Sequence, residues 1–258
     1  MNKSAKESIL AVDIGNTRIK MAIVKGDEVL AFTAIPTKEP LLESRLLQFD
    51  QWCKSNITPQ VKVGLVSSVV NDVTPKVHKF LLKYLPTVKV IGRDWDLIVS
   101  TEYSRQQIGM DIFCKGAYLA NKGMDYVCLD SGTATVITYI KDGVLTGGGI
   151  TLGYRGFYKA LKAEAPALPL LEPVKASAIF GHDTKSAIEG ANYFGYVSLL
   201  EGLVRQATLE TNCKNIIFTG GFSFLFSPVV KFQHKLDQEL LLKGIYLIYQ
   251  KNKSLILQ

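Results

Sequence analysis

The sequence predicts an α/β protein made of two related halves, each a mixed sheet flanked by helices. Short apolar, β-branched segments alternate along the chain with segments of helical periodicity. An apolar run that ends in Asp-x-Gly occurs at Asp13 and again at Asp130, 117 residues later in a chain of 258. No low-complexity linker separates the two copies. We therefore expect halves at residues 1–115 and 116–258 with a close interface.

Strand and helix patterns alternate through the first half. The helices are expected where apolar residues recur at helical spacing, as Leu46, Phe49 and Cys53 do, or where Pro75 stands in a first turn. The strands are expected where the run is short, apolar and β-branched. In order, the expected elements are strands at 9–12, 19–24 and 29–35, a helix at 41–55, a strand at 61–70, a helix at 75–84, a strand at 88–91 and a helix at 107–122 that crosses between the halves.

The second half opens with strands across 126–140 and at 144–150, and Asp142-Gly143 between them is a strong hairpin signal. Three prolines make 163–174 a loop. A long helix is expected at 184–211 and a buried strand at 215–218. Each of Gly190, Gly195 and Gly202 costs that helix about 1 kcal/mol relative to Ala. We expect close packing there against a nucleotide, the sheet or a second subunit.

The overall composition is that of a globular protein. Hydrophobic residues make up 47% and charged residues 21%, which excludes intrinsic disorder. No apolar run approaches the ~18 residues of a membrane span, and the run at 9–12 is too short for a signal peptide, so we expect a cytoplasmic protein without membrane contact. The net charge is +7, but 30 basic and 23 acidic residues are interleaved, so a nucleic-acid partner is not expected.

Three glycine-containing turns follow expected strands and fit a polyphosphate ligand. Asp13-Ile14-Gly15-Asn16-Thr17 offers backbone N–H groups and two side-chain donors, and Asp13 can hold a cation that bridges to phosphate. Asp130-Ser131-Gly132-Thr133-Ala134-Thr135 is a second such turn, and two of them can hold a polyphosphate from both sides of a cleft. Thr219-Gly220-Gly221 is the third, where a base and ribose could lie against bare backbone.

These turns resemble the motifs of the actin–hexokinase–Hsp70 superfamily of ATP-binding proteins, and within it the type III pantothenate kinases. The resemblance rests on the two Asp-x-Gly turns, Ser67–Val70, Gly148–Gly153, Asp183–Gly190 and Thr219–Gly221, and it covers nearly the whole chain. It implies two RNase H-like (actin-like ATPase) halves with a nucleotide cleft between them. It also implies ATP-dependent phosphorylation of pantothenate to 4′-phosphopantothenate, the first step of coenzyme A biosynthesis, by a homodimer that needs Mg²⁺ and a monovalent cation, K⁺ or NH₄⁺.

The resemblance also implies roles for particular residues. Asp111, in Gly109-Met110-Asp111-Ile112, matches the family's general base, but the family has Arg where this chain has Ile112. A carboxylate there can take the proton from a primary hydroxyl as it attacks the γ-phosphoryl group. ATP contacts are expected from residues 13–20 and Thr133, and a monovalent cation at Asp130. The residues expected to contact ATP are Asp13, Ile14, Gly15, Asn16, Thr17, Arg18, Ile19, Lys20 and Thr133. Those expected to contact pantothenate are Tyr103, Gly109, Met110, Asp111, Ile112 and Thr184.

Ile112 leaves two alternatives open. The chain could be a kinase of the same fold for another small alcohol, because Ile112 cannot bind a carboxylate as Arg does; Arg105 or Lys115 could take that role instead. It could also be a non-catalytic ATP-binding regulatory protein, since some members of the family have been labelled transcriptional activators. The three aspartates and the lack of a helix-turn-helix pattern favour the kinase.

Overall fold

The computed structural model describes residues 7–37 and 42–258. By its internal contacts the chain forms two compact units, unit 1 with residues 1–123 and 239–258, and unit 2 with residues 124–238. The units differ from the expected halves, since the dividing point lies at 123/124 and the C-terminal 20 residues join unit 1.

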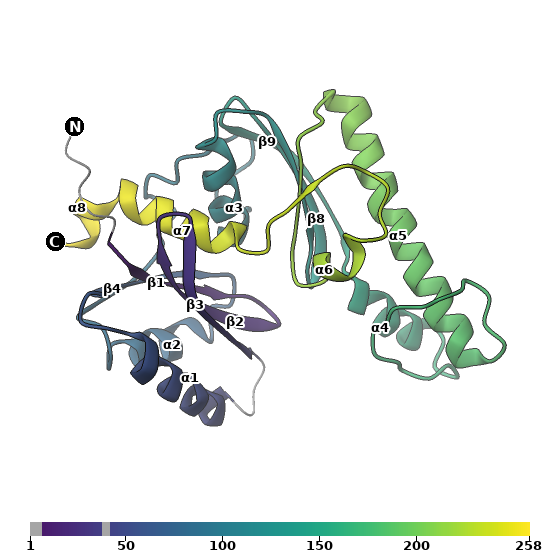
Figure 1. Ribbon diagram of the computed structural model, residues 1–258, viewed down its shortest axis with the longest axis horizontal. Helices are drawn as coiled ribbons and strands as arrows, with labels where there is room; N and C mark the ends of the chain where they lie inside the picture. The colour runs from purple at the N-terminus through teal and green to yellow at the C-terminus, as the bar shows by residue number, and fades with distance from the viewer. Residues whose placement is uncertain (1–6, 38–41) are drawn as a thin grey trace. The chain divides into compact units, whose positions relative to one another are not determined.

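Unit 1 is built on a five-stranded mixed sheet in the order β3-β2-β1-β4-β5. Strand β1 pairs antiparallel with β2 and parallel with β4. Helices α1 and α2 cover one face, and α3 and α7 cover the other (Figure 1). The bounds are β1 Ile9–Ile14, β2 Arg18–Lys25, β3 Glu28–Pro36, β4 Val63–Ser68, β5 Thr87–Val90, α1 Leu42–Asn56, α2 Thr74–Leu81, α3 Met110–Ala120 and α7 Leu240–Lys251. Unit 1 also holds the short β6 (Ser100–Thr101) and α8 (Lys253–Ile256).

Alternation along β1 decides which helices each residue meets. Leu10 and Val12 belong to the core that includes Phe49 of α1 and Val77 of α2. The alternate residues, which include Ala11 and Asp13, point to the opposite face of the sheet because side chains in a strand have a period of two. This register brings the carboxylate of Asp13 to the face covered by α3 and α7.

Helix α7 was not predicted from the sequence, and it explains why the C-terminus belongs to unit 1. It packs against α3 so closely that a Cβ atom at Gly244 would collide with the carbonyl oxygen of Cys114. The Tyr246 hydroxyl donates to the carbonyl of Glu7, just before β1, over 3.1 Å. Because α3 and α7 pack side by side on this face of the sheet, α3 stays with unit 1 in one piece, and a boundary at residue 115 would cut it.

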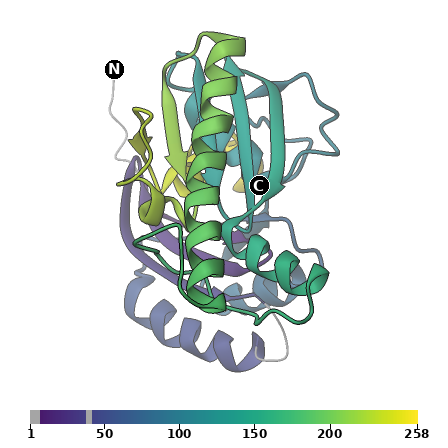
Figure 2. The ribbon, with the colours of Figure 1, turned by 90° about the vertical axis from the view of Figure 1, so that its right-hand side faces the viewer.

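Unit 2 repeats the plan of unit 1. Its strands lie in the order β9-β8-β7-β10-β11, with β7 antiparallel to β8 and parallel to β10, as β1 is to β2 and β4. Helix α5 runs along one face of this sheet, with α4 beside it (Figure 2). The bounds are β7 Tyr126–Ser131, β8 Ala134–Lys141, β9 Val144–Leu152, β10 Ile216–Thr219, β11 Lys235–Leu236, α4 Tyr154–Glu164, α5 Thr184–Thr211 and α6 Ser223–Phe226. The predicted pair of related α/β halves is therefore confirmed.

Several local predictions for unit 2 are confirmed and one is corrected. The Asp142-Gly143 turn has positive φ at both residues, 49° and 78°, as its hairpin requires. Helix α5 has the predicted bounds, and its N-cap is Asp183, which accepts from the Ser186 N–H. Residues 163 and 164, expected in a loop, end the unpredicted helix α4.

The three glycines of α5 have different surroundings. A Cβ atom at Gly190 would lie 2.5 Å from the carbonyl oxygen of Ala178, so this glycine packs closely against the loop before α5, a partner that the expectation did not name. At Gly195 and Gly202 a Cβ would meet open space, so neither position packs closely within the described residues. Among the helices of residues 7–37 and 42–258, none is long and apolar enough to cross a membrane.

Candidate functional site

The first glycine turn joins β1 to β2 in unit 1. The Gly15 N–H donates to the carbonyl of Arg18 over 3.1 Å, and the Thr37 hydroxyl donates to the carbonyl of Gly15 over 2.6 Å. Thr37 thus fixes the turn from the end of β3. Asn16, Thr17 and Arg18 are exposed at its tip, whereas Ile14 and Ile19 are buried and anchor it to the core. The predicted ATP residues 13–20 therefore form one continuous hairpin.

Asp13 is a buried carboxylate at the mouth of this hairpin. Only 4% of the residue is exposed, and its Oδ2 lies 3.5 Å from Nζ of its cross-strand partner Lys20. Burial raises the pKa of Asp13 to about 6, which Lys20 opposes and the nearby carboxylate of Asp111 reinforces. Asp13 is thus electron-rich, desolvated and only partly neutralised, which favours the approach of a cation.

Ser67 lies beside Asp13 on the neighbouring parallel strand β4, where the two residues share one register position. Its hydroxyl is fully buried and has no nitrogen or oxygen hydrogen-bond partner among the described residues. It lies beside the weakly polar Cys114 thiol. Burial raises the pKa of that thiol far above its ordinary value. Cys114 is therefore inert, and the polar group of this corner is the Ser67 hydroxyl.

Asp111 stands in the first turn of α3, in the same unit. Oδ2 accepts from Nζ of Lys115, one helical turn later, over 3.1 Å. Burial raises the pKa of Asp111, but Lys115 and the backbone N–H groups of the helix start outweigh it, so this pKa lies below its ordinary value. Asp111 is therefore an ionised carboxylate at neutral pH, as a proton acceptor must be.

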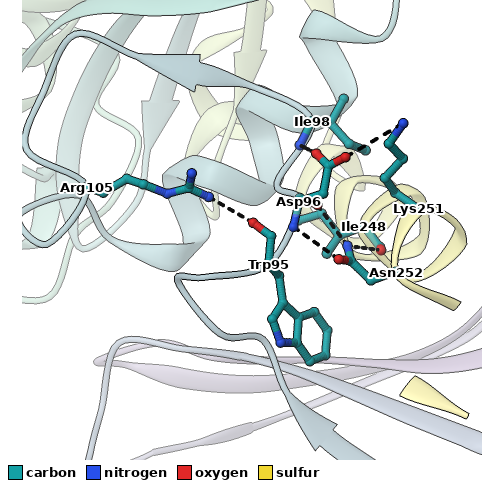
Figure 3. A network of polar contacts seen from close by, with 7 residues as sticks. All are labelled: Trp95, Asp96, Ile98, Arg105, Ile248, Lys251 and Asn252. Carbon is teal, nitrogen blue, oxygen red and sulfur yellow. Dashed lines mark hydrogen bonds and ion pairs between the residues drawn. The ribbon is translucent and has the colours of Figure 1, made fainter. Parts of the chain in front are cut away.

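The segment between β5 and α3 forms a wall that directly precedes, along the chain, the helix that carries Asp111. It lines a hollow of about 410 Å³ whose lining includes Leu97, Tyr103 and Arg105, and Tyr103 is 42% exposed. Asp96 pins the segment: its backbone N–H and C=O both bond the side-chain amide of Asn252, and its carboxylate accepts from the Ile98 N–H (Figure 3). These bonds hold Ile98 at φ 70°, which a β-branched residue rarely adopts.

Arg105 is committed within this same wall. Its Nη2 donates to the carbonyl of Trp95 over 2.9 Å (Figure 3). Its guanidinium lies over the ring of Phe113, with 5.7 Å to the ring centroid. Arg93 in turn donates to the carbonyls of Arg105 and Ile108. Arg105 therefore helps to hold the wall in its conformation.

The second glycine turn joins β7 to β8 in unit 2. The Gly132 N–H donates to the carbonyl of Ala134 over 3.1 Å, and the hydroxyl of Tyr196 on α5 lies 2.7 Å from both Ser131 Oγ and Thr135 Oγ1. Thr133 is exposed at the tip. Tyr196 ties both flanks of the turn to the long helix, and sequence reasoning missed it because its apolar helical spacing looks like ordinary core.

Glycines surround the carboxylate of Asp130. A Cβ atom at Gly132 would lie 3.2 Å from its Oδ1, and one at Gly220, where φ is 97°, would collide with the same oxygen. Gly220 belongs to the third glycine turn, so two of the predicted turns come together here. The carboxylate of Asp130 therefore packs directly against the backbone of both glycines, and a side chain at either position would displace it.

Thr184 lies apart from these turns, exposed in the first turn of α5 in unit 2. The structure brings together residues 13–20, Ser67, Asp111 and Lys115 in unit 1, and Asp130, Gly132, Thr133 and Gly220 in unit 2. Three positions that support the turns or the wall were unpredicted: Thr37, at the end of an expected strand, Tyr196, within the expected long helix, and Asn252, in a stretch to which no element was assigned.

A family profile described as type III pantothenate kinase matches residues 9–206, which includes both Asp-x-Gly turns and Asp111. The chain belongs to this family. Type III pantothenate kinases of Agathobacter rectalis and Brevibacillus brevis are 31% and 29% identical to it, and the alignments cover 94% and 95% of this chain and 97% and 100% of theirs. The chain is accordingly a kinase, of a class of enzymes that use ATP.

Solved structures confirm the fold class. A putative Baf family transcriptional activator from Campylobacter jejuni matches with a TM-score of 0.59 at 19% identity, covering 95% of this chain and 99% of that one. A putative N-acetylmannosamine kinase from Listeria monocytogenes matches with a TM-score of 0.51 at 15% identity, with the same coverages. Both likenesses concern the fold alone, which is that of the actin-like ATPases and sugar kinases.

Proposed function

We propose that this chain transfers the γ-phosphoryl group of ATP to the primary hydroxyl of pantothenate, the first step of coenzyme A biosynthesis. The observation that carries the proposal is the family match over residues 9–206. The arrangement in unit 1 supports it, because an ionised carboxylate, Asp111, lies within electrostatic reach of the buried Asp13 at the first phosphate turn. A base and a phosphate-binding hairpin are what phosphoryl transfer to an alcohol needs.

In the proposed reaction Asp111 is the proton acceptor, and the glycine turns bind the phosphates. The acceptor hydroxyl gives its proton to Asp111 while its oxygen bonds the γ-phosphorus, and the bond from that phosphorus to the β,γ-bridging oxygen breaks to leave ADP. The hairpin of residues 13–20 and the exposed Thr133 bind the phosphates through N–H and hydroxyl groups. Tyr103, Gly109, Met110, Ile112 and Thr184 are the proposed pantothenate contacts.

Asp13 fits Mg²⁺. In the described part of the chain no three His, Cys, Asp or Glu side chains gather as a metal cage. Magnesium needs none, because it is bound through one or two carboxylates together with phosphates and water. Asp13 would supply the protein carboxylate and the buried Ser67 hydroxyl a neighbouring oxygen. When bound, the ion neutralises charge on the β- and γ-phosphates.

Asp130 fits the monovalent cation, K⁺ or NH₄⁺. The support is that Oδ1 lies against Gly132 and Gly220, which bring no side chain of their own to this carboxylate. We also propose a cytoplasmic homodimer without a nucleic-acid partner. The open faces of Gly195 and Gly202 on α5 support a close-packed second subunit, since glycine in a helix is costly without a close neighbour.

The test is a coupled assay of ADP formation by the purified chain with ATP, Mg²⁺ and K⁺, with and without pantothenate. We expect ADP formation to depend on pantothenate and 4′-phosphopantothenate to be found by mass spectrometry. The Asp111→Asn variant is the matched control, because it keeps the shape of the side chain and removes the proton acceptor. ATP turnover that pantothenate leaves unchanged would contradict the proposal.

One observation favours a second candidate, phosphorylation of another small alcohol. Ile112 replaces an Arg that would bind the substrate through charge-assisted hydrogen bonds, and Arg105 is held by the Trp95 carbonyl. A panel of primary alcohols with and without a carboxylate, in the same assay, separates the candidates. Faster turnover of an uncharged alcohol than of pantothenate would favour the second.

A further inference from the structure

The side chain of Lys115 is buried beside the proposed base. Only 7% of it is exposed, and Nζ lies 3.1 Å from Oδ2 of Asp111. A lysine is almost never buried in a soluble protein unless it is paired, because an ammonium loses its hydration there. The ion pair with Asp111 therefore accounts for the burial of the Lys115 ammonium in unit 1.

The pair also fixes which oxygen of Asp111 remains for chemistry. Oδ2 is held by Lys115, and Oδ1 lies against Gly109. A Cβ atom on residue 109 would collide with Oδ1. The carboxylate therefore has one defined orientation, with Lys115 on Oδ2 and the backbone of Gly109 packed against Oδ1. A carboxylate that is held in this way cannot swing its second oxygen away from an acceptor.

Two other basic residues of this part of unit 1, Lys20 and Arg105, contact groups other than Asp111. Lys20 pairs with Asp13 at 3.5 Å, and Arg105 donates to the Trp95 carbonyl. Position 112, next to the base, is an isoleucine. Lys115 is also close enough to Asp13 to favour its ionised form. It thus lies where two carboxylates of like charge must be kept near each other.

We propose that Lys115 is a positioning residue for the acceptor step, holding Oδ2 of Asp111 so that Oδ1 receives the hydroxyl proton. This inference rests on the proposed function. Lys115 keeps its own proton throughout; the proton from the hydroxyl goes to Oδ1, and the ion pair becomes a hydrogen bond between an ammonium and a neutral carboxyl group. In this chain the cation beside the base therefore comes from the next helical turn, since position 112 offers none.

A double-mutant cycle tests the inference. Lys115→Met should lower kcat for pantothenate at least about tenfold, bounded by the ~10²–10⁴-fold contribution of a general base, with the KM for ATP within about twofold. In the Asp111→Asn background the same substitution should change kcat less than about twofold, because Lys115 acts through Asp111. Lys115→Arg should restore most of the kcat.

Lys54→Met is the matched control, since Lys54 forms the same i,i+4 pair with Asp50 on the exposed side of α1. It should leave kcat unchanged. If Lys115→Met does not fold, Lys115→Gln replaces it in the cycle, because Gln removes the charge and keeps a polar group at this buried position. Circular dichroism establishes that each variant is folded.

Two results would overturn the inference while pantothenate turnover by the wild type stands. One is a fall in kcat of equal size in the wild-type and Asp111→Asn backgrounds. The other is a higher KM for pantothenate at unchanged kcat, which would make Lys115 a direct contact of the substrate carboxylate. A wild-type chain that does not phosphorylate pantothenate would instead overturn the proposed function, and this inference with it.

Discussion

In unit 1 the Val69 N–H, just after β4, donates to the carbonyl of Ile14, and in unit 2 the Phe222 N–H, beyond β10, donates to the carbonyl of Ser131 over 2.8 Å. Each accepting residue lies directly before the glycine of its Asp-x-Gly turn. The two turns thus have the same backbone support from the neighbouring parallel strand. The 117-residue repeat in the sequence is a repeat in structure.

The side chains around the two turns differ. The first turn has buried charge, since Asp13 pairs with Lys20 and lies near Asp111. The second has neutral hydroxyls and glycines, with Tyr196 bonded to two hydroxyls and Asp130 next to Gly132 and Gly220. One backbone plan therefore supports two environments, one with buried paired charges and one with hydroxyls and glycines. The proposed division is Mg²⁺ at the first turn and K⁺ or NH₄⁺ at the second.

The largest expected effect separates the two aspartates. Asp13→Asn should lower kcat about 10²–10³-fold, a range typical of losing one electrostatic group in a water-excluded site. Asp130→Asn should only remove the response to K⁺, so its activity should equal that of the wild type without K⁺. Steady-state assays across K⁺ and Mg²⁺ concentrations measure both. Equal loss in the two variants with K⁺ response intact would mean that the turns do not divide these roles.

The second expected effect is on stability and concerns pH. Asp13 has a pKa of about 6 when folded and an ordinary one when unfolded. The folded chain binds the proton more tightly, so the free energy of unfolding falls as pH rises from about 4 to about 6 and stays lower above that. Asp13→Asn removes this cost and should stabilise the chain at pH 7.5 by on the order of 2–3 kcal/mol.

Thermal unfolding at pH 5.0 and 7.5 with EDTA and without nucleotide measures this effect. The difference in Tm between Asp13→Asn and wild type should be larger at pH 7.5. Asp130→Asn is the matched variant at the second turn, where the aspartate is half-buried. A variant that is less stable than wild type at both pH values would show that the Asp13–Lys20 pair outweighs the burial of the carboxylate.

The third expected effect contrasts the glycines. Gly220→Ala places a Cβ atom at φ 97° against Asp130 and 2.6 Å from the backbone of Ser131, so it should destabilise by about 1–3 kcal/mol and remove the K⁺ response. Gly15→Ala meets only the Arg18 carbonyl at 3.3 Å outside the left-handed region, so its cost should be under about 1 kcal/mol. Thermal unfolding of both variants tests this order, and the reverse order would contradict it.

The sequence predicted the paired sheets well because the turns that define them are local. Asp13, Gly15, Asp130 and Gly132 lie next to the strands that they join, and a strand-and-glycine pattern carries that information by itself. Helix α5 was found because its apolar spacing continues over many turns. The candidate base, Asp111, was found only through the family motif, since one carboxylate in a helix start has many ordinary explanations.

What the sequence did not predict depends on contacts between distant residues. Helix α7 joins unit 1 because Gly244 admits the backbone of α3, which lies over a hundred residues earlier. The Asn252 amide bonds the backbone of Asp96 across a similar separation. The role of Tyr196 needs β7, β8 and α5 at once. The periodicity of a single segment therefore does not predict contacts between residues that are far apart in the sequence.

The smallest expected effect tests whether the hydroxyl network supports the second turn as the charge network supports the first. Tyr196→Phe leaves the buried Ser131 hydroxyl without the Tyr196 bond, whereas Thr135 still donates to the carbonyl of Leu152. We expect a loss of stability of about 1 kcal/mol and a KM for ATP raised a few-fold, because Thr133 sits on the loosened turn. The matched control is Tyr193→Phe, one turn earlier on α5, whose buried hydroxyl has no hydrogen-bond partner among the described residues. That variant should be neutral or slightly stabilising, with an unchanged KM for ATP. If Tyr196→Phe matches Tyr193→Phe in both stability and KM, then the second turn is held by its backbone bonds and glycines alone, and the two turns differ in charge only.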